Sequence, residues 1–149
     1  MKGLAGYNRP MKRSEKVSHL MTSEPLTVHE KQKPSDARAL LREHNIHHVP
    51  VVRGSKFVGL ISTNDLLRVS YGDAFAQDTR TVDALLDTLT ITQVMVEDIV
   101  TATPDTTIRE VAETLANGAF HCIPIVDAAG DLKGVVTTTD LIRHLLAQY

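Results

Sequence analysis

The residues best suited to hold a ligand are two aspartates, each placed just after a run of hydroxyl side chains. The first stretch is Gly59-Leu-Ile-Ser-Thr-Asn-Asp65, and the second is Gly134-Val-Val-Thr-Thr-Thr-Asp140. Each reads as a strand that turns into a helix, with the aspartate in the first helical turn. A carboxylate there lies beside backbone N–H groups that have no partner within the helix. Such a site suits a ligand that carries both a diol and an anionic group.

The hydroxyl groups beside the aspartates support this interpretation, although ordinary helix capping would use the same residue types. Ser62, Thr63, Thr137 and Thr138 supply short donors next to the carboxylates. Serine or threonine at an N-cap, followed by an acidic residue in the first turn, is also a common way to begin a helix. Ordinary capping is the stronger interpretation of a single stretch, and the recurrence of the stretch in paired modules leaves the two interpretations evenly balanced.

The two stretches belong to a longer internal repeat. Met95 stands 74 positions after Met21 (95 − 21), and Pro124 stands 74 after Pro50 (124 − 50). The offset becomes 75 at the aspartates (140 − 65), because one residue has been added in the turn at 127–131, where an insertion costs little. A register this regular indicates two similar modules.

Each copy is predicted to run strand, helix, strand, strand, helix, which makes the fold class α/β with two similar modules. In the first copy we expect a short helix at 17–21, strands at 25–28, 46–52 and 57–61, a helix capped by Ser35 or Asp36, a hairpin turn at 53–56, and a helix capped by Ser62 or Thr63. Neither copy alone would bury much core, so the two modules are expected to pack face to face.

The predicted division of the chain has four parts. Residues 1–16 form a basic, flexible N-terminal tail, 17–70 the first module, 71–92 an unduplicated connector, and 93–149 the second module. The connector begins as a loop and should then hold a helix at 81–89. The apolar stripe of that helix holds Val82, Leu85, Leu86 and Leu89, with Asp83 and Asp87 outside it.

Composition excludes several classes of function. The 149 residues carry 16 Lys and Arg against 18 Asp and Glu, and aromatic residues make up only 4%. Broad capture of nucleic acid or of an anionic membrane is therefore not expected. There is one cysteine, no long apolar run and no secretory signal, so a cytoplasmic protein that does not enter the membrane is expected.

The repeated set of motifs resembles a tandem pair of CBS domains, the regulatory module named after cystathionine β-synthase. His47-His-Val-Pro-Val-Val52 and His121-Cys-Ile-Pro-Ile-Val126 precede the two aspartate motifs, and a Met-hydrophobic-Thr segment opens each copy. The resemblance covers about residues 17–70 and 93–149. It implies two modules related by a pseudo-twofold axis and packed sheet to sheet, with clefts between them for an adenosine-containing ligand.

The resemblance also assigns the ligand and the residues that hold it. The implied ligand is AMP, ADP, ATP or S-adenosylmethionine, with no cofactor or metal required. It further implies a homodimer that signals to a separate, unidentified partner protein. The implied binding residues, which place the ribose at the aspartates and the base at the strand backbone, are Asp65, Asp140, Ser62, Thr63, Thr137, Thr138, Thr27, Thr101, His48, Val49, Pro50, Cys122, Ile123 and Pro124.

Three other interpretations compete with the sensor. Catalysis is not expected, because Cys122 lies in an apolar strand whose neighbour His121 should point to the opposite face. A metal site at His44, His47 and His48 is disfavoured, because the helix should end before His48. A ligand-free dimerisation module is the most serious alternative. Arg68 and Arg143, three residues after the aspartates, can reach phosphates or act as surface or dimer contacts.

Overall fold

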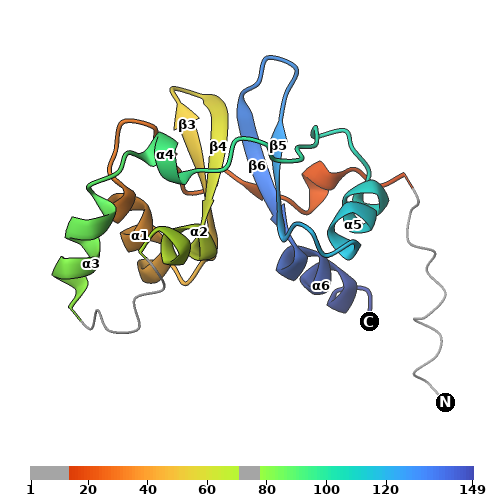
Figure 1. The fold of residues 1–149 in the computed structure, drawn as a ribbon. Coiled ribbons are helices and arrows are strands. Elements are labelled where there is room, and N and C mark those ends of the chain that lie inside the picture. The colour runs from red at the N-terminus through yellow and green to blue at the C-terminus, as the bar shows by residue number, and fades with distance from the viewer. Residues whose placement is uncertain (1–13, 71–77) are drawn as a thin grey trace. The chain divides into compact units, whose positions relative to one another are not determined.

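The computed structural model describes residues 14–70 and 78–149. Most of the predicted N-terminal tail and the loop that opens the connector lie outside these described residues. The chain forms two compact units (Figure 1). Unit A is Pro25–Ile99, and unit B combines the residues up to Glu24 with Val100–Tyr149.

Both units are α/β, as predicted. Unit A contains β2 (Val28–His29), α1 (Pro34–Glu43), β3 (His48–Arg53), β4 (Lys56–Ser62), α2 (Thr63–Val69), α3 (Thr79–Leu86) and α4 (Ile91–Val94). Unit B contains the 3-10 helix η1 (Val17–His19), β1 (Thr22–Ser23), α5 (Ile108–Ala116), β5 (Cys122–Val126), β6 (Leu132–Thr137) and α6 (Thr138–Leu146). The connector helix begins and ends earlier than the predicted 81–89.

The sheet of unit A has the order β2-β3-β4. Strand β2 runs parallel to β3, and the β3–β4 hairpin is antiparallel, with His48 opposite Ser62. The hairpin turn contains Gly54 with a φ of 60°, a left-handed conformation that glycine adopts without strain. Because β3 pairs with strands on both sides, its central residues are buried and apolar.

The sheet of unit B contains an equivalent hairpin, but a different strand pairs with its edge. Strands β5 and β6 are antiparallel, with Cys122 opposite Thr137, which matches the pairing of His48 with Ser62. Ala102 forms a parallel bridge to Ile125 at the place that β2 occupies in unit A. Strand β1 pairs with the free edge of β6, so the three-stranded order is β1-β6-β5.

The short segment that opens each sequence repeat packs against the sheet and helices of the other repeat. Residues 17–23 open the first copy, yet Val17 lies in the core of unit B and β1 pairs with β6. Conversely, Ile91 and Val94 lie in the core of unit A, and Val96 bridges to Leu60 on β4. The compact units and the sequence copies are therefore divided at different residues.

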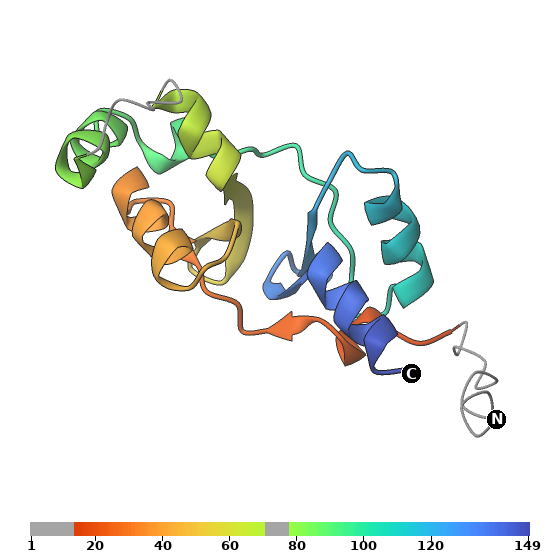
Figure 2. The ribbon, with the colours of Figure 1, turned by 90° about the horizontal axis from the view of Figure 1, so that it is seen from below.

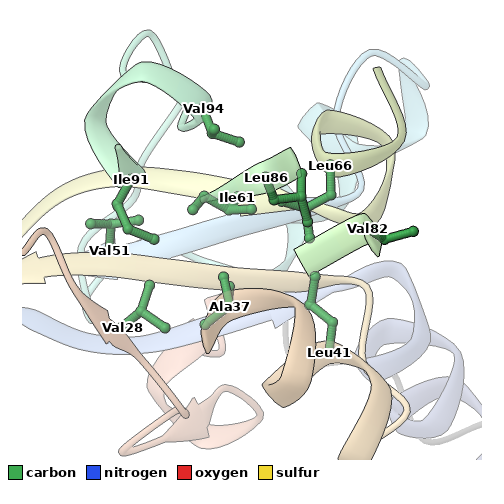
Figure 3. Close-up of a cluster of buried hydrophobic side chains, with 11 residues drawn as sticks. Val28, Ala37, Leu41, Val51, Ile61, Leu66, Val82, Leu86, Ile91 and Val94 are labelled. Carbon is green, nitrogen blue, oxygen red and sulfur yellow. The ribbon is translucent and has the colours of Figure 1, made fainter. Parts of the chain in front are cut away.

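The core of unit A gathers apolar side chains from the sheet and from four helices (Figure 3). Val28, Val51 and Ile61 come from the strands, and Leu66 comes from α2. Helix α3 adds Val82 and Leu86, which are 9% and 1% exposed, whereas Leu85, which was predicted to share their stripe, is 37% exposed. The inserted helix thus closes the core of unit A, where it contacts α1.

Asp83 and Asp87, which lie outside the apolar stripe of α3, both contact α1 through their carboxylates. Asp87 accepts hydrogen bonds from the backbone N–H of Ser35 at 2.9 Å and from its hydroxyl at 2.6 Å. Asp83 pairs with Arg38 at 3.0 Å. The carboxylate of Asp87 therefore satisfies one of the unpaired N–H groups at the start of α1.

The start of α1 also differs from the predicted cap. Helix α1 begins at Pro34, which has no N–H to leave unpaired, so the N-cap position falls on Lys33 and not on Ser35 or Asp36. The Asp36 carboxylate accepts a hydrogen bond from the Lys33 N–H at 2.9 Å. Asp36 thus supports the cap from the first helical turn without being the cap residue.

Among the described residues, unit B has only two α-helices, and the 3-10 helix η1 adds Val17 to their core. Helices α5 and α6 lie side by side and contact β5 and β6 respectively (Figure 2). Helix α6 leaves large apolar side chains exposed, with Ile142 at 52%, Leu145 at 45% and Leu146 at 64%. The two helix pairs are therefore covered to different extents.

Candidate functional site

Asp65 occupies the third position of α2, and its carboxylate is fully hydrogen-bonded within the helix start. Ser62 is the N-cap, which resolves the predicted choice between Ser62 and Thr63. The Asp65 Oδ2 accepts from the Ser62 N–H and the Ser62 hydroxyl, both at 2.8 Å. The Asp65 N–H donates to the Ser62 Oγ at 3.1 Å. This reciprocal capping box fixes the carboxylate at the strand-to-helix turn.

The other carboxylate oxygen of Asp65 is also engaged. Arg68 donates from Nη2 to the Asp65 Oδ1 at 2.9 Å, across one helical turn. The Asp65 side chain is only 9% exposed, whereas that of Arg68 is 66% exposed. The three-residue spacing pointed to a shared helical face, but it did not identify Asp65 itself as the partner of Arg68.

Asp140 repeats the capping box at the start of α6 with Thr137 as N-cap. Its Oδ2 accepts from the Thr137 N–H at 2.9 Å and the Thr137 hydroxyl at 3.2 Å. Within residues 14–70 and 78–149, no hydrogen bond or ion pair is formed to the Asp140 Oδ1 or by the Arg143 guanidinium. Asp140 is half-buried and thus offers one carboxylate oxygen to a ligand.

The hairpin register brings the predicted strand residues to the caps. His48 lies opposite Ser62, and Cys122 lies opposite Thr137. The backbone N–H of Thr63 donates to the His47 carbonyl at 3.0 Å, and Thr138 donates to the His121 carbonyl at 3.3 Å. Hydroxyl, carboxylate and strand backbone therefore meet at the same end of each hairpin. Val49, Pro50, Ile123 and Pro124 continue these strands as buried residues.

Cys122 is buried beside the second motif and is 3% exposed. Burial, with a smaller contribution from the Asp140 charge, raises the pKa of the Cys122 thiol to about 12. Adjacent His121 precedes β5 and is exposed, so it does not share the buried environment of the thiol. A thiol that stays protonated at neutral pH is a poor nucleophile, so it packs as a small apolar side chain.

Thr27 and Thr101, the two predicted binding residues that precede the outer strands, lie apart from the aspartate motifs. Thr27 comes just before β2, which lies on the opposite side of β3 from β4 and the helix cap that follows β4. Thr101 comes just before the Ala102 bridge, which lies on the opposite side of β5 from β6 and the helix cap that follows β6. In the described ranges, neither threonine forms a hydrogen bond to an aspartate or to a cap residue. Their assignment stays a prediction.

A hollow of about 460 Å³ lies in unit A between α1, α2 and α3. Apolar side chains such as Leu41, Leu66 and Leu86 line it together with Arg42, His47 and Thr63. Thr63 is the only predicted ligand-binding residue that lines it, and Asp65 does not. This hollow is therefore a feature of the helix layer and differs from the predicted ribose site.

Neither a metal centre nor a membrane span is present in the parts of the chain that the structure describes. In those parts, no three His, Cys, Asp or Glu side chains come together to hold one ion. His44 follows the end of α1, whereas His48 lies in β3, so the three histidines do not share one helix face. No described helix is long and apolar enough to cross a membrane.

Comparison with known proteins identifies the repeated unit. The family described as CBS domain matches twice, at residues 17–72 and 91–147. L-aspartate semialdehyde sulfurtransferase of Methanocaldococcus jannaschii is 28% identical over 138 residues. That alignment covers 91% of this chain but only 24% of the sulfurtransferase, so the chain spans about a quarter of that relative's length.

Solved structures share the fold along nearly the whole chain. The CBS domain of a CBS domain-containing membrane protein from Sphaerobacter thermophilus is 30% identical, with a TM-score of 0.71 and 88% of each chain covered. The CBS domain pair of protein MJ0100, in complex with 5′-methylthioadenosine and S-adenosyl-L-methionine, is 27% identical with a TM-score of 0.70. That match covers 90% of this chain and 98% of the MJ0100 chain.

Proposed function

The chain belongs to the CBS domain family, and from that premise we propose that it is a non-catalytic sensor of an adenosine-containing ligand. The ligand is AMP, ADP, ATP or S-adenosylmethionine, and its ribose hydroxyls donate to the motif carboxylates Asp65 and Asp140. The single observation that carries the proposal is the paired capping box, which holds each carboxylate at the start of a helix.

The chemistry of the cap explains why a carboxylate there selects a ribose. One oxygen of each aspartate is held by the N-cap residue, so the carboxylate cannot rotate away. The other oxygen of Asp140 points to no described protein donor and can accept a hydroxyl. Hydrogen bonds to a charged acceptor contribute about 1.5–3 kcal/mol each, enough to distinguish a ribose from a sugar without hydroxyls. The adenosine ligands of MJ0100 support this ligand class.

A panel of ligands tests the proposal by thermal unfolding. AMP, ADP, ATP and S-adenosylmethionine are each added to the whole protein, with guanosine monophosphate as the control for nonspecific anion binding. A ligand at 100 times its dissociation constant adds about 2.7 kcal/mol of stability if it binds only the folded chain. We expect at least one adenosine compound to raise the melting temperature; no rise with any of them would contradict the proposal.

We propose that the ligand's signal reaches a separate, unidentified protein. A ligand-free dimerisation module is the second candidate function. The exposed apolar residues Ile142, Leu145 and Leu146 on α6 favour it, since a surface of this kind is often covered by another protein. Replacement of Leu145 and Leu146 by glutamate tests this surface, because a dimer held by it would become monomeric by light scattering. Ligand binding then distinguishes the two functions: a sensor still binds an adenosine compound, whereas a ligand-free module binds none.

A further inference from the structure

The two motif aspartates differ in what occupies their second oxygen. Both use Oδ2 for the capping box, with closely similar distances. The Asp65 Oδ1 accepts from Arg68 at 2.9 Å. Arg143 stands at the same three-residue step from Asp140, yet in the described parts of the chain it makes no ion pair with that carboxylate. Equivalent residues in the two repeats thus have unequal hydrogen bonding.

Burial reinforces the difference. The Asp65 side chain is 9% exposed beneath the guanidinium, whereas Asp140 is half-buried and no described residue donates to its Oδ1. Arg68 takes one of the hydrogen-bonding positions of the Asp65 Oδ1, so a ribose hydroxyl meets the guanidinium when it approaches that oxygen. Arg68 itself is 66% exposed, so it can swing into water at little cost in free energy. Competition should therefore weaken the Asp65 site without closing it.

Resting on the ligand class proposed above, we propose that Arg68 sets the relative affinity of the two sites by competing with the ribose for Asp65. The Asp140 site fills first, and the Asp65 site fills at higher ligand concentration. Couplings measured for exposed ion pairs correspond to about a two- to five-fold change in affinity, which is the weakening that Arg68 should cause. A chain with two such sites responds over a wider range of ligand concentration than one with equal sites.

Adenosine is the appropriate probe, because it has a ribose and a base but no phosphate. Arg68 can attract a phosphate as well as a carboxylate, so an anionic nucleotide would mix two opposite effects. With adenosine, only the competition for Asp65 changes when Arg68 is removed. Asp140→Asn isolates the Asp65 site, and the amide oxygen that this substitution introduces still accepts from the Thr137 N–H and so keeps the cap.

The test compares adenosine binding by calorimetry in Asp140→Asn and in Asp140→Asn/Arg68→Ala. We expect the second variant to bind adenosine about two- to five-fold more tightly, with a smaller difference at 1 M salt, where ion pairs are screened. Asp140→Asn/Arg143→Ala is the matched control and should bind as Asp140→Asn does. Circular dichroism establishes that every variant is folded.

The outcomes separate this inference from the function on which it rests. Equal or weaker adenosine binding after Arg68→Ala, in a protein whose wild type binds adenosine, overturns the role of Arg68 and leaves the proposed function intact. An equal gain in adenosine affinity from Arg143→Ala would also overturn the role of Arg68, because the gain would then come from the loss of any positive charge. No adenosine or nucleotide binding by the wild type overturns both.

Discussion

Gly134→Ala should destabilise the protein because β1 passes directly over this residue. A Cβ atom built at Gly134 would lie 2.7 Å from the Thr22 carbonyl oxygen and 2.8 Å from the Met21 sulfur. Ser23 is the Cα partner of Gly134 in the β1–β6 pairing. The Met21 side chain can move, but the carbonyl belongs to the paired backbone, so β1 must shift away from β6.

Gly59→Ala is the matched control, because Gly59 holds the same position in the other repeat. Its Cβ would meet mainly the Met95 side chain, with the sulfur at 2.6 Å, and the Val96 carbonyl oxygen only at 3.2 Å. Overpacking typically costs about 1–3 kcal/mol, so we expect about 2–3 kcal/mol for Gly134→Ala and about 1 kcal/mol for Gly59→Ala.

Urea denaturation followed by circular dichroism measures both costs. Each variant's midpoint is compared with that of the wild type at one temperature and pH, and unchanged slopes allow the midpoints to be read as free energies. A Gly134→Ala protein as stable as the wild type, or less affected than Gly59→Ala, would refute the reasoning. The residues that open the first repeat would then not be docked on β6.

The remaining predictions concern a buried thiol and the inserted helix α3. The pKa of the Cys122 thiol is about 12 in the folded chain, against an ordinary value of 9.0. Above pH 9 the unfolded chain therefore releases a proton that the folded chain keeps. As a result, the free energy of unfolding falls as the pH rises toward 12. Between pH 9 and 10 the wild type should lose about 1 kcal/mol more than Cys122→Ala by urea denaturation, and parallel curves would contradict the burial of this thiol. Leu86→Ala should lower the free energy of unfolding by about 2–4 kcal/mol, because Leu86 is 1% exposed. Leu85→Ala at the neighbouring position, which is 37% exposed, should lower it by less than half as much in the same assay. Equal losses would mean that α3 is not packed as described. Asp87→Ala removes two hydrogen bonds to Ser35 and should lower the stability by about 1–2 kcal/mol, and a thermal melt with no change would show that this contact is not formed in solution.

Local sequence signals predicted the helix starts at the site well. The Ser62 and Asp65 pair and the Thr137 and Asp140 pair are three residues apart, and that spacing alone determines which hydrogen bonds a capping box can form. The hairpins were equally predictable, since Gly54 sits between two apolar runs. These features depend on residues that are neighbours along the chain.

The features that sequence reasoning missed depend on distant partners. The contact of Asp87 with Ser35 was missed because a position outside the apolar stripe says nothing about a partner 52 residues away. The packing of each opening segment on the other repeat was missed for the same reason. The repeat register relates Met21 to Met95, but it does not reveal which of the two sheets each segment packs against. Pairing across such separations is fixed by packing of the whole core and not by local propensity.

Discrimination between AMP and 2′,3′-dideoxy-AMP tests the central claim most directly. Calorimetry would compare both ligands with the wild type and with Asp65→Asn/Asp140→Asn, in which the amide oxygens keep the caps while the charges that accept the hydroxyls are removed. We predict that the wild type prefers AMP by at least about tenfold, since hydrogen bonds to a charged group contribute about 1.5–3 kcal/mol each, and that the double variant loses this preference. The same preference in both proteins would contradict the assignment of the ribose to the two aspartates.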